Sequence, residues 1–353
     1  MVTLDGIIFS LQRTGGISVC FQEFFKRVVA VDLDAELLLF DKSAETRVGG
    51  SSKHIRQCRH RFLERYRDCE VSPAATLFHS SYYRVPVSNK IPVVTTVHDF
   101  TYERFNSGIK RWVHSSQKFN AIKKASAIIC VSDHTRKDLL ELLPEIEAEK
   151  VHVIHNGVGS SFFPIEVESN YPTHRPYVLF VGSRVFYKNF RAVAESLENL
   201  TDLEIVCVGG GDFSEDELKF LEYKVPGRYR HEGDVSEKKL NQLYNQAQCL
   251  LYPSSYEGFG IPVLEAMSAG CPVVALNSSS IPEVAGDAAL LLDSADPDLL
   301  VAAIEQTADT AFRREIRQKG FLQAQLFSWD QSFIQTLKVY EEVTGCAFPY
   351  RPL

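Results

Sequence analysis

Short runs of apolar, β-branched residues alternate with amphipathic helical patterns along most of the chain. In the helical segment 17–30, Ile17, Phe21, Phe24 and Val28 recur at spacings of four, three and four and define one apolar face. The runs in the first half that predict strands are 7–10, 36–40, 76–79, 93–98, 127–131 and 151–155. This alternation indicates βαβ units, in which helices cover both faces of a parallel sheet.

The second half repeats this scheme independently. The predicted strands are 177–182, 204–208, 229–231, 249–252, 272–276 and 289–292, and the predicted helices between them are 190–200, 215–223, 237–246 and 262–269. Beyond residue 292 only helical patterns follow, over 297–308, 312–326 and 329–343, the last with Ser328 as its expected N-cap.

The segment 156–175 separates the two halves. It contains two glycines and two prolines and shows little periodicity, which is typical of a connection between domains. We therefore predict an α/β protein of two Rossmann-like domains, 1–168 and 169–328, with a terminal segment 329–353. Open parallel sheets bind ligands at the carboxyl ends of their strands, so we expect both sheets to face a central cleft that holds a small molecule.

Charge is distributed unevenly along the chain of 353 residues. Residues 1–170 contain 22 Lys and Arg against 20 Asp and Glu, whereas residues 171–353 contain 16 against 25. The asymmetry predicts different roles for the two halves. The protein is acidic overall and has no nucleic-acid motif, so no nucleic-acid partner is expected.

The cysteine pattern and hydropathy predict a cytoplasmic location. Eight scattered cysteines form no Cys-x-x-Cys pair, which favours reduced thiols in a reducing compartment. The first nine residues include Asp5 and lack the basic start of a secretory signal, and no apolar run approaches the ~18 residues of a membrane span. Peripheral contact with the inner face of a membrane stays open.

The segment 256–267 carries the strongest chemical signal. Gly258 and Gly260 allow a ligand to approach the backbone closely, and the start of the helix that follows offers free N–H groups to an anion. Glu257 and Glu265 lie in the loop and the early turns of that helix, so both carboxylates can face one cleft. Carboxylates match hydroxyl groups such as those of a sugar and a ribose.

The run EGFGIPVLE, with Glu257 and Glu265 separated by seven residues, resembles the E-x7-E signature of retaining glycosyltransferases of family 4. The resemblance implies the GT-B fold and extends over nearly the whole chain. It implies that Glu257 contacts the transferred sugar, that Glu265 binds the ribose of the nucleotide, and that Gly258, Phe259 and Gly260 line the donor site. It also implies that the helix within 329–353 crosses back to pack on the first domain.

Two other features of the first domain resemble the same family. Gly15 and Gly16 follow Gln12, Arg13 and Thr14 and look like its glycine-rich loop facing the donor diphosphate and acceptor, although a tight turn is the alternative. His98 ends the strand 93–98 and resembles the family histidine that reaches the donor sugar; a satisfied buried histidine is the alternative.

In the second domain, Gly182, Arg184 and Lys188 resemble the family's R-x4-K pair, in which two cations neutralise the departing diphosphate. Here three residues separate the two cations instead of four. Gly209 and Gly210 resemble the turn near the nucleotide base, with an ordinary strand-to-helix turn as the alternative. No metal ligand set is predicted, and Arg184 and Lys188 take the electrostatic role of a metal in this interpretation.

A basic stretch, 53–67, interleaves Lys, Arg and His with apolar residues. It could attract anionic lipid headgroups, hold a diphosphate-linked acceptor such as a polyprenyl-diphosphate glycan, or form a solvated helix face.

The resemblance favours a retaining transferase in bacterial surface polysaccharide synthesis, such as O-antigen synthesis, that needs no cofactor beyond its nucleotide-sugar donor. GDP-mannose is the first expectation and a UDP-hexose the second, with a glycan or lipid-linked glycan as acceptor. The alternatives are a sugar-nucleotide epimerase, a dehydrogenase, which lacks the expected G-x-G-x-x-G, and a non-catalytic nucleotide-sugar-binding protein.

Overall fold

The computed structural model describes residues 1–12, 15–49, 52–88, 90–165 and 175–348. The chain divides into two compact units: unit 1 comprises Met1–Gly157 and Ser328–Leu353, and unit 2 comprises Val158–Phe327. The ends of unit 2 meet, because the Val158 N–H donates to the Phe327 carbonyl at 3.4 Å. The boundary expected between residues 168 and 169 lies outside the described residues.

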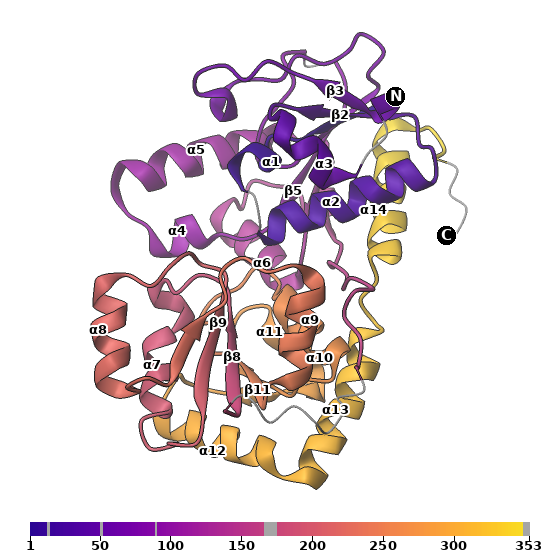
Figure 1. The fold of residues 1–353 in the computed structure, drawn as a ribbon. Helices are drawn as coiled ribbons and strands as arrows, with labels where there is room; N and C mark the ends of the chain where they lie inside the picture. The colour runs from indigo at the N-terminus through magenta and orange to yellow at the C-terminus, as the bar shows by residue number, and fades with distance from the viewer. Residues whose placement is uncertain (13–14, 50–51, 89, 166–174, 349–353) are drawn as a thin grey trace. The chain divides into compact units, whose positions relative to one another are not determined.

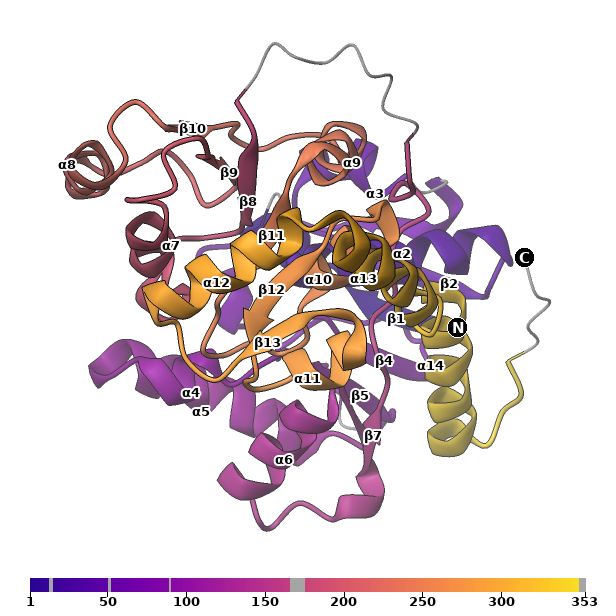
Figure 2. The same ribbon diagram turned by 90° about the horizontal axis from the view of Figure 1, so that it is seen from below.

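Unit 1 is built on a parallel seven-stranded sheet in the order β3-β2-β1-β4-β5-β6-β7. Helices lie on both faces of this sheet (Figures 1 and 2). The strands are β1 Val2–Asp5, β2 Ala35–Leu39, β3 Ile55–Gln57, β4 Leu77–Ser80, β5 Val93–Val97, β6 Ala127–Cys130 and β7 Val151–Val153. The helices are α1 Ile8–Leu11, α2 Gly16–Ala30, α3 Glu45–Val48, α4 Thr101–Phe105, α5 Gly108–Lys124, α6 Asp133–Leu142 and α14 Trp329–Thr344.

The strand predicted at 7–10 is wrong. The first strand is β1, and the apolar run that follows it forms the short helix α1. All four residues of β1 are buried, and it pairs with both β2 and β4 in the sheet. A short apolar run fits a buried strand and a buried helical turn equally well, so its periodicity could not separate the two.

The C-terminal helix α14 belongs to unit 1. The Ser328 side chain accepts a hydrogen bond from the Asp330 N–H and caps the helix as predicted. Phe333 and Tyr340 pack against Phe24 of α2, with ring centroids 5.1 and 6.1 Å apart. Return of the chain to the first domain is therefore confirmed, and α14 closes one face of its core.

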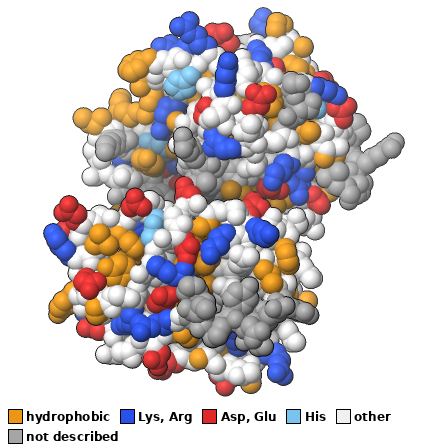
Figure 3. All heavy atoms as spheres, in the orientation of Figure 1, with side chains coloured by type: hydrophobic (Ala, Val, Ile, Leu, Met, Phe, Trp, Pro, Cys, Tyr) orange, Lys and Arg blue, Asp and Glu red, His pale blue; other side chains and the backbone are white. Residues whose placement is uncertain are grey.

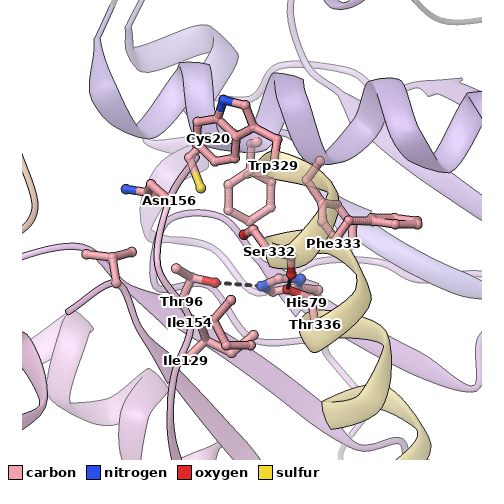
Figure 4. A pocket seen from close by; sticks show the side chains of 13 residues that line it. Cys20, His79, Thr96, Ile129, Ile154, Asn156, Trp329, Ser332, Phe333 and Thr336 are labelled. Carbon is pink, nitrogen blue, oxygen red and sulfur yellow. Dashed lines mark hydrogen bonds between the residues drawn. The ribbon is translucent and has the colours of Figure 1, made fainter. Parts of the chain in front are cut away.

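A small cavity lies beneath α14 in unit 1. It has a volume of about 20 Å³, and Figure 4 shows Cys20, His79, Thr96 and Trp329 around it. His79 is hydrogen-bonded on both ring nitrogens, to Thr96 at 2.8 Å and to Tyr340 at 2.5 Å. Burial lowers the pKa of His79 to about 3, so the ring is neutral. A space of this size holds about one water molecule, so we assign the cavity to packing between helix and sheet.

Unit 2 contains a parallel six-stranded sheet in the order β10-β9-β8-β11-β12-β13. Its strands are β8 Tyr177–Val181, β9 Glu204–Val208, β10 Tyr229–His231, β11 Cys249–Tyr252, β12 Val273–Leu276 and β13 Leu290–Leu292. Its helices are α7 Phe190–Ser196, α8 Glu215–Lys224, α9 Glu237–Gln246, α10 Ile261–Ala269, α11 Ile281–Ala285, α12 Pro297–Ala308 and α13 Thr310–Ala324. The central strands are buried along almost their whole length, as expected for a sheet covered on both faces.

The predicted architecture of two parallel Rossmann-like sheets is confirmed. No helix in the described part of the chain combines the length and hydrophobicity needed to cross a membrane. All eight cysteines are free thiols, and Cys346 alone among them is exposed.

Candidate functional site

Two glycine loops meet at the carboxyl edge of the unit 2 sheet, after β8 and β9. The Gly182 N–H donates to the Val208 carbonyl at 2.9 Å, which continues the pairing of the two strands. Gly210 has a φ of +76°, and a Cβ atom there would lie 2.6 Å from the Gly182 carbonyl oxygen and 2.8 Å from the Ser183 Cα. This close approach is possible only for glycine, and it places the loops predicted to face the nucleotide side by side.

The Arg184 side chain is turned into the loop that follows β9. Its guanidinium donates to the carbonyl oxygens of Gly209, Gly211 and Asp212, at 3.2, 2.8 and 2.9 Å. It also donates through Nε to Glu217 on α8 at 2.9 Å. Only 3% of this side chain is exposed, so its charge is used inside the protein.

Lys188 contacts Glu257 directly. The Lys188 ammonium donates to Glu257 Oε1 and lies 3.4 Å from the Tyr252 hydroxyl, and the two charged side chains are 12% and 13% exposed. Asn189, with a φ of +54°, donates to the Pro253 carbonyl at 2.7 Å and so ties the loop after β8 to the loop after β11. One predicted cation and one predicted carboxylate thus form a single ion pair at the strand ends.

The loop carrying Glu257 is held by two serines that the sequence reasoning missed. The Glu257 N–H donates to Ser279 Oγ at 2.8 Å, and Ser280 Oγ donates to the carbonyls of Glu257 and Phe259 at 3.0 and 2.9 Å. Both serines belong to a polar run directly after β12. Their position at the end of a predicted strand is the sequence feature that could have indicated a role in the site. Their hydroxyl groups fix the direction of the Glu257 backbone.

Helix α10 begins where the sequence places it. Gly260, at a φ of +106°, precedes its first turn, Pro262 lies in that turn, and Gly270 ends the helix in a left-handed conformation. Phe259 is buried and packs against Phe327 with centroids 5.8 Å apart, so its side chain belongs to the core and only its backbone is available to a ligand.

Glu265 lies on α10 and accepts a hydrogen bond from the buried Tyr244 of α9 at 2.9 Å. Burial raises the pKa of Glu265 to about 7, the Tyr244 hydrogen bond lowers it, and nearby Glu237 raises it. A carboxylate that is largely desolvated and has one protein donor is well suited to accept a hydrogen bond from a ligand hydroxyl. Sequence reasoning missed Tyr244, which looks like an ordinary core residue of an amphipathic helix.

In unit 1, His98 follows β5 and is buried, with 6% of its surface exposed. Burial lowers its pKa to about 4, while Asp99 raises it and Lys118 lowers it. The imidazole is therefore neutral near pH 7, and its Nε2 has no hydrogen-bond partner among the described residues. A buried, unsatisfied ring nitrogen is costly unless a ligand meets it.

A buried lysine supports the backbone next to His98. Lys118 donates to the Asp99 carbonyl at 2.9 Å and to Glu103 at 2.7 Å, and its side chain is fully buried. Ser115 and Lys118 donate hydrogen bonds to Glu103. Burial raises the pKa of Glu103, but His114, Lys118 and Ser115 lower it to about 2. This pairing holds the strand end rigidly and was not anticipated from the sequence.

The glycine loop of unit 1 is described only in part, because Arg13 and Thr14 lie outside the described residues. Gly15 has an extended backbone and accepts a hydrogen bond from Ser18 Oγ at 2.8 Å, while Gly16 is the first residue of α2. The loop follows α1 and not a strand, as the corrected position of β1 requires.

The basic stretch 53–67 does not form one amphipathic helix. It runs through two short 3-10 turns and the edge strand β3. Arg61 pairs with the buried Glu64 at 2.8 Å, and Arg65 lies over the rings of Tyr66 and Tyr82. Part of its charge is therefore used within unit 1. Among the described residues, no group of three His, Cys, Asp or Glu is placed to hold a metal ion.

The chain is similar in sequence to known glycosyltransferases. Residues 163–321 match the family model described as "Glycosyl transferases group 1", and residues 48–162 match "Glycosyltransferase Family 4". The O-antigen chain mannosyltransferase B of Escherichia coli is 30% identical over 266 residues, which span 70% of each chain.

Solved structures share the fold over nearly the full length. Sucrose-phosphate synthase from Thermosynechococcus elongatus has a TM-score of 0.78 at 18% identity, covering 98% of this chain and 99% of its own. Anabaena HepE in complex with UDP and glucose has a TM-score of 0.73 at 16% identity, covering 96% and 99%.

The fold and the family models define a glycosyltransferase of the GT-B class. The chain belongs to glycosyltransferase family 4, and the expected family, fold class and type of enzyme are confirmed.

Proposed function

We propose that this protein is a retaining glycosyltransferase that moves a hexose, with mannose the first choice, from a nucleotide-diphosphate sugar to a glycan or lipid-linked glycan. The observation that carries the proposal is the Lys188–Glu257 pair beside two glycine loops at the strand ends of unit 2. The pair joins a group suited to phosphate with a group suited to sugar hydroxyls. The relative from Escherichia coli, named as a mannosyltransferase, supports the choice of mannose.

In this proposal Lys188 meets the charge that develops on the departing diphosphate. The N–H groups at the start of α10, with Gly258 and Gly260 before it, favour the same anion. Glu257 orients the sugar, and Glu265 binds the ribose hydroxyls. In a front-side reaction the leaving phosphate oxygen takes the acceptor proton as the glycosidic bond breaks and the new bond forms on the same face, so no protein base is needed.

In this proposal unit 1 binds the acceptor and also contributes His98 and the backbone of Gly15 and Gly16 to the donor. Neutral His98 can donate or accept one hydrogen bond to the sugar through its unpartnered Nε2. The backbone of Gly15 and Gly16 faces the diphosphate. We assign acceptor binding to residues 1–168, donor binding to 169–328 and packing to 329–353.

The donor is tested by thermal stabilisation with GDP, UDP, ADP and NAD, since a ligand that binds only the folded state raises apparent stability. We expect GDP to give the largest shift and GDP-mannose to support transfer. A UDP-hexose is the alternative donor, as the HepE complex with UDP and glucose illustrates. No shift with any nucleotide would favour a non-catalytic scaffold, and a shift with NAD alone would favour a dehydrogenase.

Alanine variants of Glu257 and Glu265 test whether the first residue acts on the sugar and the second on the nucleotide. Glu257→Ala should abolish transfer and leave nucleotide affinity largely intact. Glu265→Ala should weaken nucleotide binding first. The assignment is overturned if Glu257→Ala loses nucleotide binding to the same degree as transfer.

We also propose that the stretch 53–67 contacts an anionic membrane surface, where a lipid-linked acceptor would lie. Phe62 and Leu63 are 81% and 53% exposed and sit among exposed basic residues such as Arg59. Hydrophobic side chains also gather at the left edge of unit 1, over α5 (Figure 3).

Co-sedimentation with vesicles of phosphatidylglycerol and phosphatidylcholine tests this contact. Phe62→Ala should reduce binding to the anionic vesicles, whereas the control Tyr223→Ala, at a 78% exposed position in unit 2, should not. Equal binding of the wild type to vesicles of phosphatidylcholine alone would contradict an electrostatic contact.

A further inference from the structure

We propose that Arg184 is a positioning residue that holds the 209–212 loop in its nucleotide-binding shape, and that Lys188 is the cation left for the diphosphate. This division of labour rests on the proposed function, because it assumes that the loop borders a bound nucleotide. It differs from the pattern that the sequence suggests, in which both cations contact phosphate.

The hydrogen bonds of Arg184 carry the argument. A guanidinium has five N–H groups, and four of those of Arg184 are used: one by Glu217 and three by the carbonyls of Gly209, Gly211 and Asp212. The ring of Phe213 lies 4.6 Å from its central carbon. To reach a phosphate, this side chain would have to leave three carbonyl groups. Among the described contacts, the Gly209 oxygen also lies 2.9 Å from His231 Nε2.

The loop needs such a fixed partner. Gly209, Gly210 and Gly211 have φ values of +73°, +76° and +74°, three successive left-handed residues. Glycine loses more conformational entropy on ordering than any other residue, so a triglycine turn has little rigidity of its own. The flat, forked guanidinium bonds three carbonyls from one plane and joins them to α8, which a point charge cannot do.

The Lys188 side chain makes fewer of the described hydrogen bonds than the Arg184 side chain does, and none of them to a backbone carbonyl. Within the described parts of the chain, its ammonium has one charged partner, Glu257, and a weaker contact with Tyr252. It stands on a flexible side chain at the carboxyl edge of the sheet. An ammonium can turn from Glu257 to a phosphate without disturbing any backbone carbonyl. The spacing of the two residues fits this division, because Arg184 stands one position closer to Lys188 than in the family pair it resembles.

The experiment compares the binding of GMP and GDP, or of UMP and UDP if those are the nucleotides bound, by calorimetry. The variants are Arg184→Ala, Arg184→Lys and Lys188→Ala. Lys188→Ala should reduce the preference for the diphosphate by about tenfold, the usual effect of losing a charge-assisted hydrogen bond. Arg184→Ala should weaken both nucleotides by the same factor and leave their ratio unchanged.

Arg184→Lys separates charge from shape. If Arg184 bound phosphate, Arg184→Lys would keep the positive charge and with it part of the preference for the diphosphate. A point charge cannot replace an arginine that bonds three carbonyls, so Arg184→Lys should bind both nucleotides as weakly as Arg184→Ala does. Rescue by lysine, together with a selective loss of diphosphate binding in Arg184→Ala, would overturn the proposal.

A milder variant covers the case in which Arg184→Ala does not fold. Glu217→Gln removes the charged partner on α8 and leaves both cations in place, and it should weaken the two nucleotides equally. Hydrogen exchange without ligand gives a second reading, since the amides of the 209–212 loop should exchange faster in Arg184→Lys than in the wild type. Unchanged exchange would refute the positioning role, whereas failure of the wild type to bind any nucleotide would refute only the proposed function.

Discussion

Replacing Tyr244 by Phe isolates one hydrogen bond at the proposed ribose site. The substitution keeps the buried ring and removes the hydroxyl that donates to Glu265 at 2.9 Å. The pKa of Tyr244 itself is raised well above 10 by burial and by Glu265, so the hydroxyl remains a donor throughout the neutral range. Any effect on ligand binding therefore reports the ionisation of Glu265.

The magnitude follows from the value of a hydrogen bond to a charged group. Such a bond contributes ~1.5–3 kcal/mol, equivalent to roughly 1–2 pKa units. Loss of the Tyr244 donor should therefore raise the pKa of Glu265 from about 7 toward roughly 8–9. Since the ribose hydroxyl needs the ionised carboxylate, nucleotide affinity at pH 7 should fall about 5- to 50-fold and recover at higher pH.

The assay is a calorimetric titration of the nucleoside diphosphate from about pH 6 to about pH 9. Phosphate ionisation affects both proteins equally and cancels in the ratio of their affinities. Tyr177→Phe is the matched control, because Tyr177 is also buried but donates to the Leu243 carbonyl at 2.8 Å. A deficit of Tyr244→Phe that is the same at every pH would refute the reasoning.

Three further predictions follow from the geometry. Gly210→Ala should lower the free energy of unfolding by about 2–4 kcal/mol and abolish nucleotide binding, whereas Gly211→Ala, with open space around its Cβ position, should cost about 1 kcal/mol in urea denaturation. Because His98 has a pKa of about 4, His98→Gln should lower kcat/KM by the same factor between about pH 6 and about pH 8. The raised pKa of Glu265 means that its ionised form opposes folding as the pH rises from 4.5 through about 7. Glu265→Gln should therefore raise the free energy of unfolding by about 1–3 kcal/mol at pH 8 and far less near pH 5.

The strands of unit 2 were predictable because strands buried on both faces of a parallel sheet are apolar along almost their whole length. Glu204–Val208 and Cys249–Tyr252 match the predicted ranges residue for residue. The hydrophobic pattern of the sequence marked edge strands and surface helices less clearly. Strand β3 lies within a basic stretch, and α5 exposes Ile109 and Trp112 to 81% and 71%, so its hydrophobic pattern does not mark a single buried face.

The types of residue in the site were predictable from the sequence, but the contacts between them were less so. Spacing placed Glu257 before α10 and Glu265 on it. The partner of Glu257 is Lys188, 69 positions away, and that contact depends on how the loops after β8 and β11 meet. The bonds of Arg184 to the 209–212 loop have the same origin, since neighbouring strands in a parallel sheet are distant in sequence. Nothing local in the sequence distinguishes an arginine that bonds carbonyls from one that awaits phosphate.

The way the chain leaves unit 1 and returns to it has a consequence for biosynthesis. A ribosome synthesises all of unit 2 before it makes α14, so the first unit lacks a helix throughout the synthesis of the second. Until then Phe24 and its neighbours on α2 have no cover from Phe333 and Tyr340. The nascent chain should therefore recruit chaperones through its amino-terminal half, and a released chain that ends before residue 329 should leave that half sensitive to protease while residues 175–327 resist.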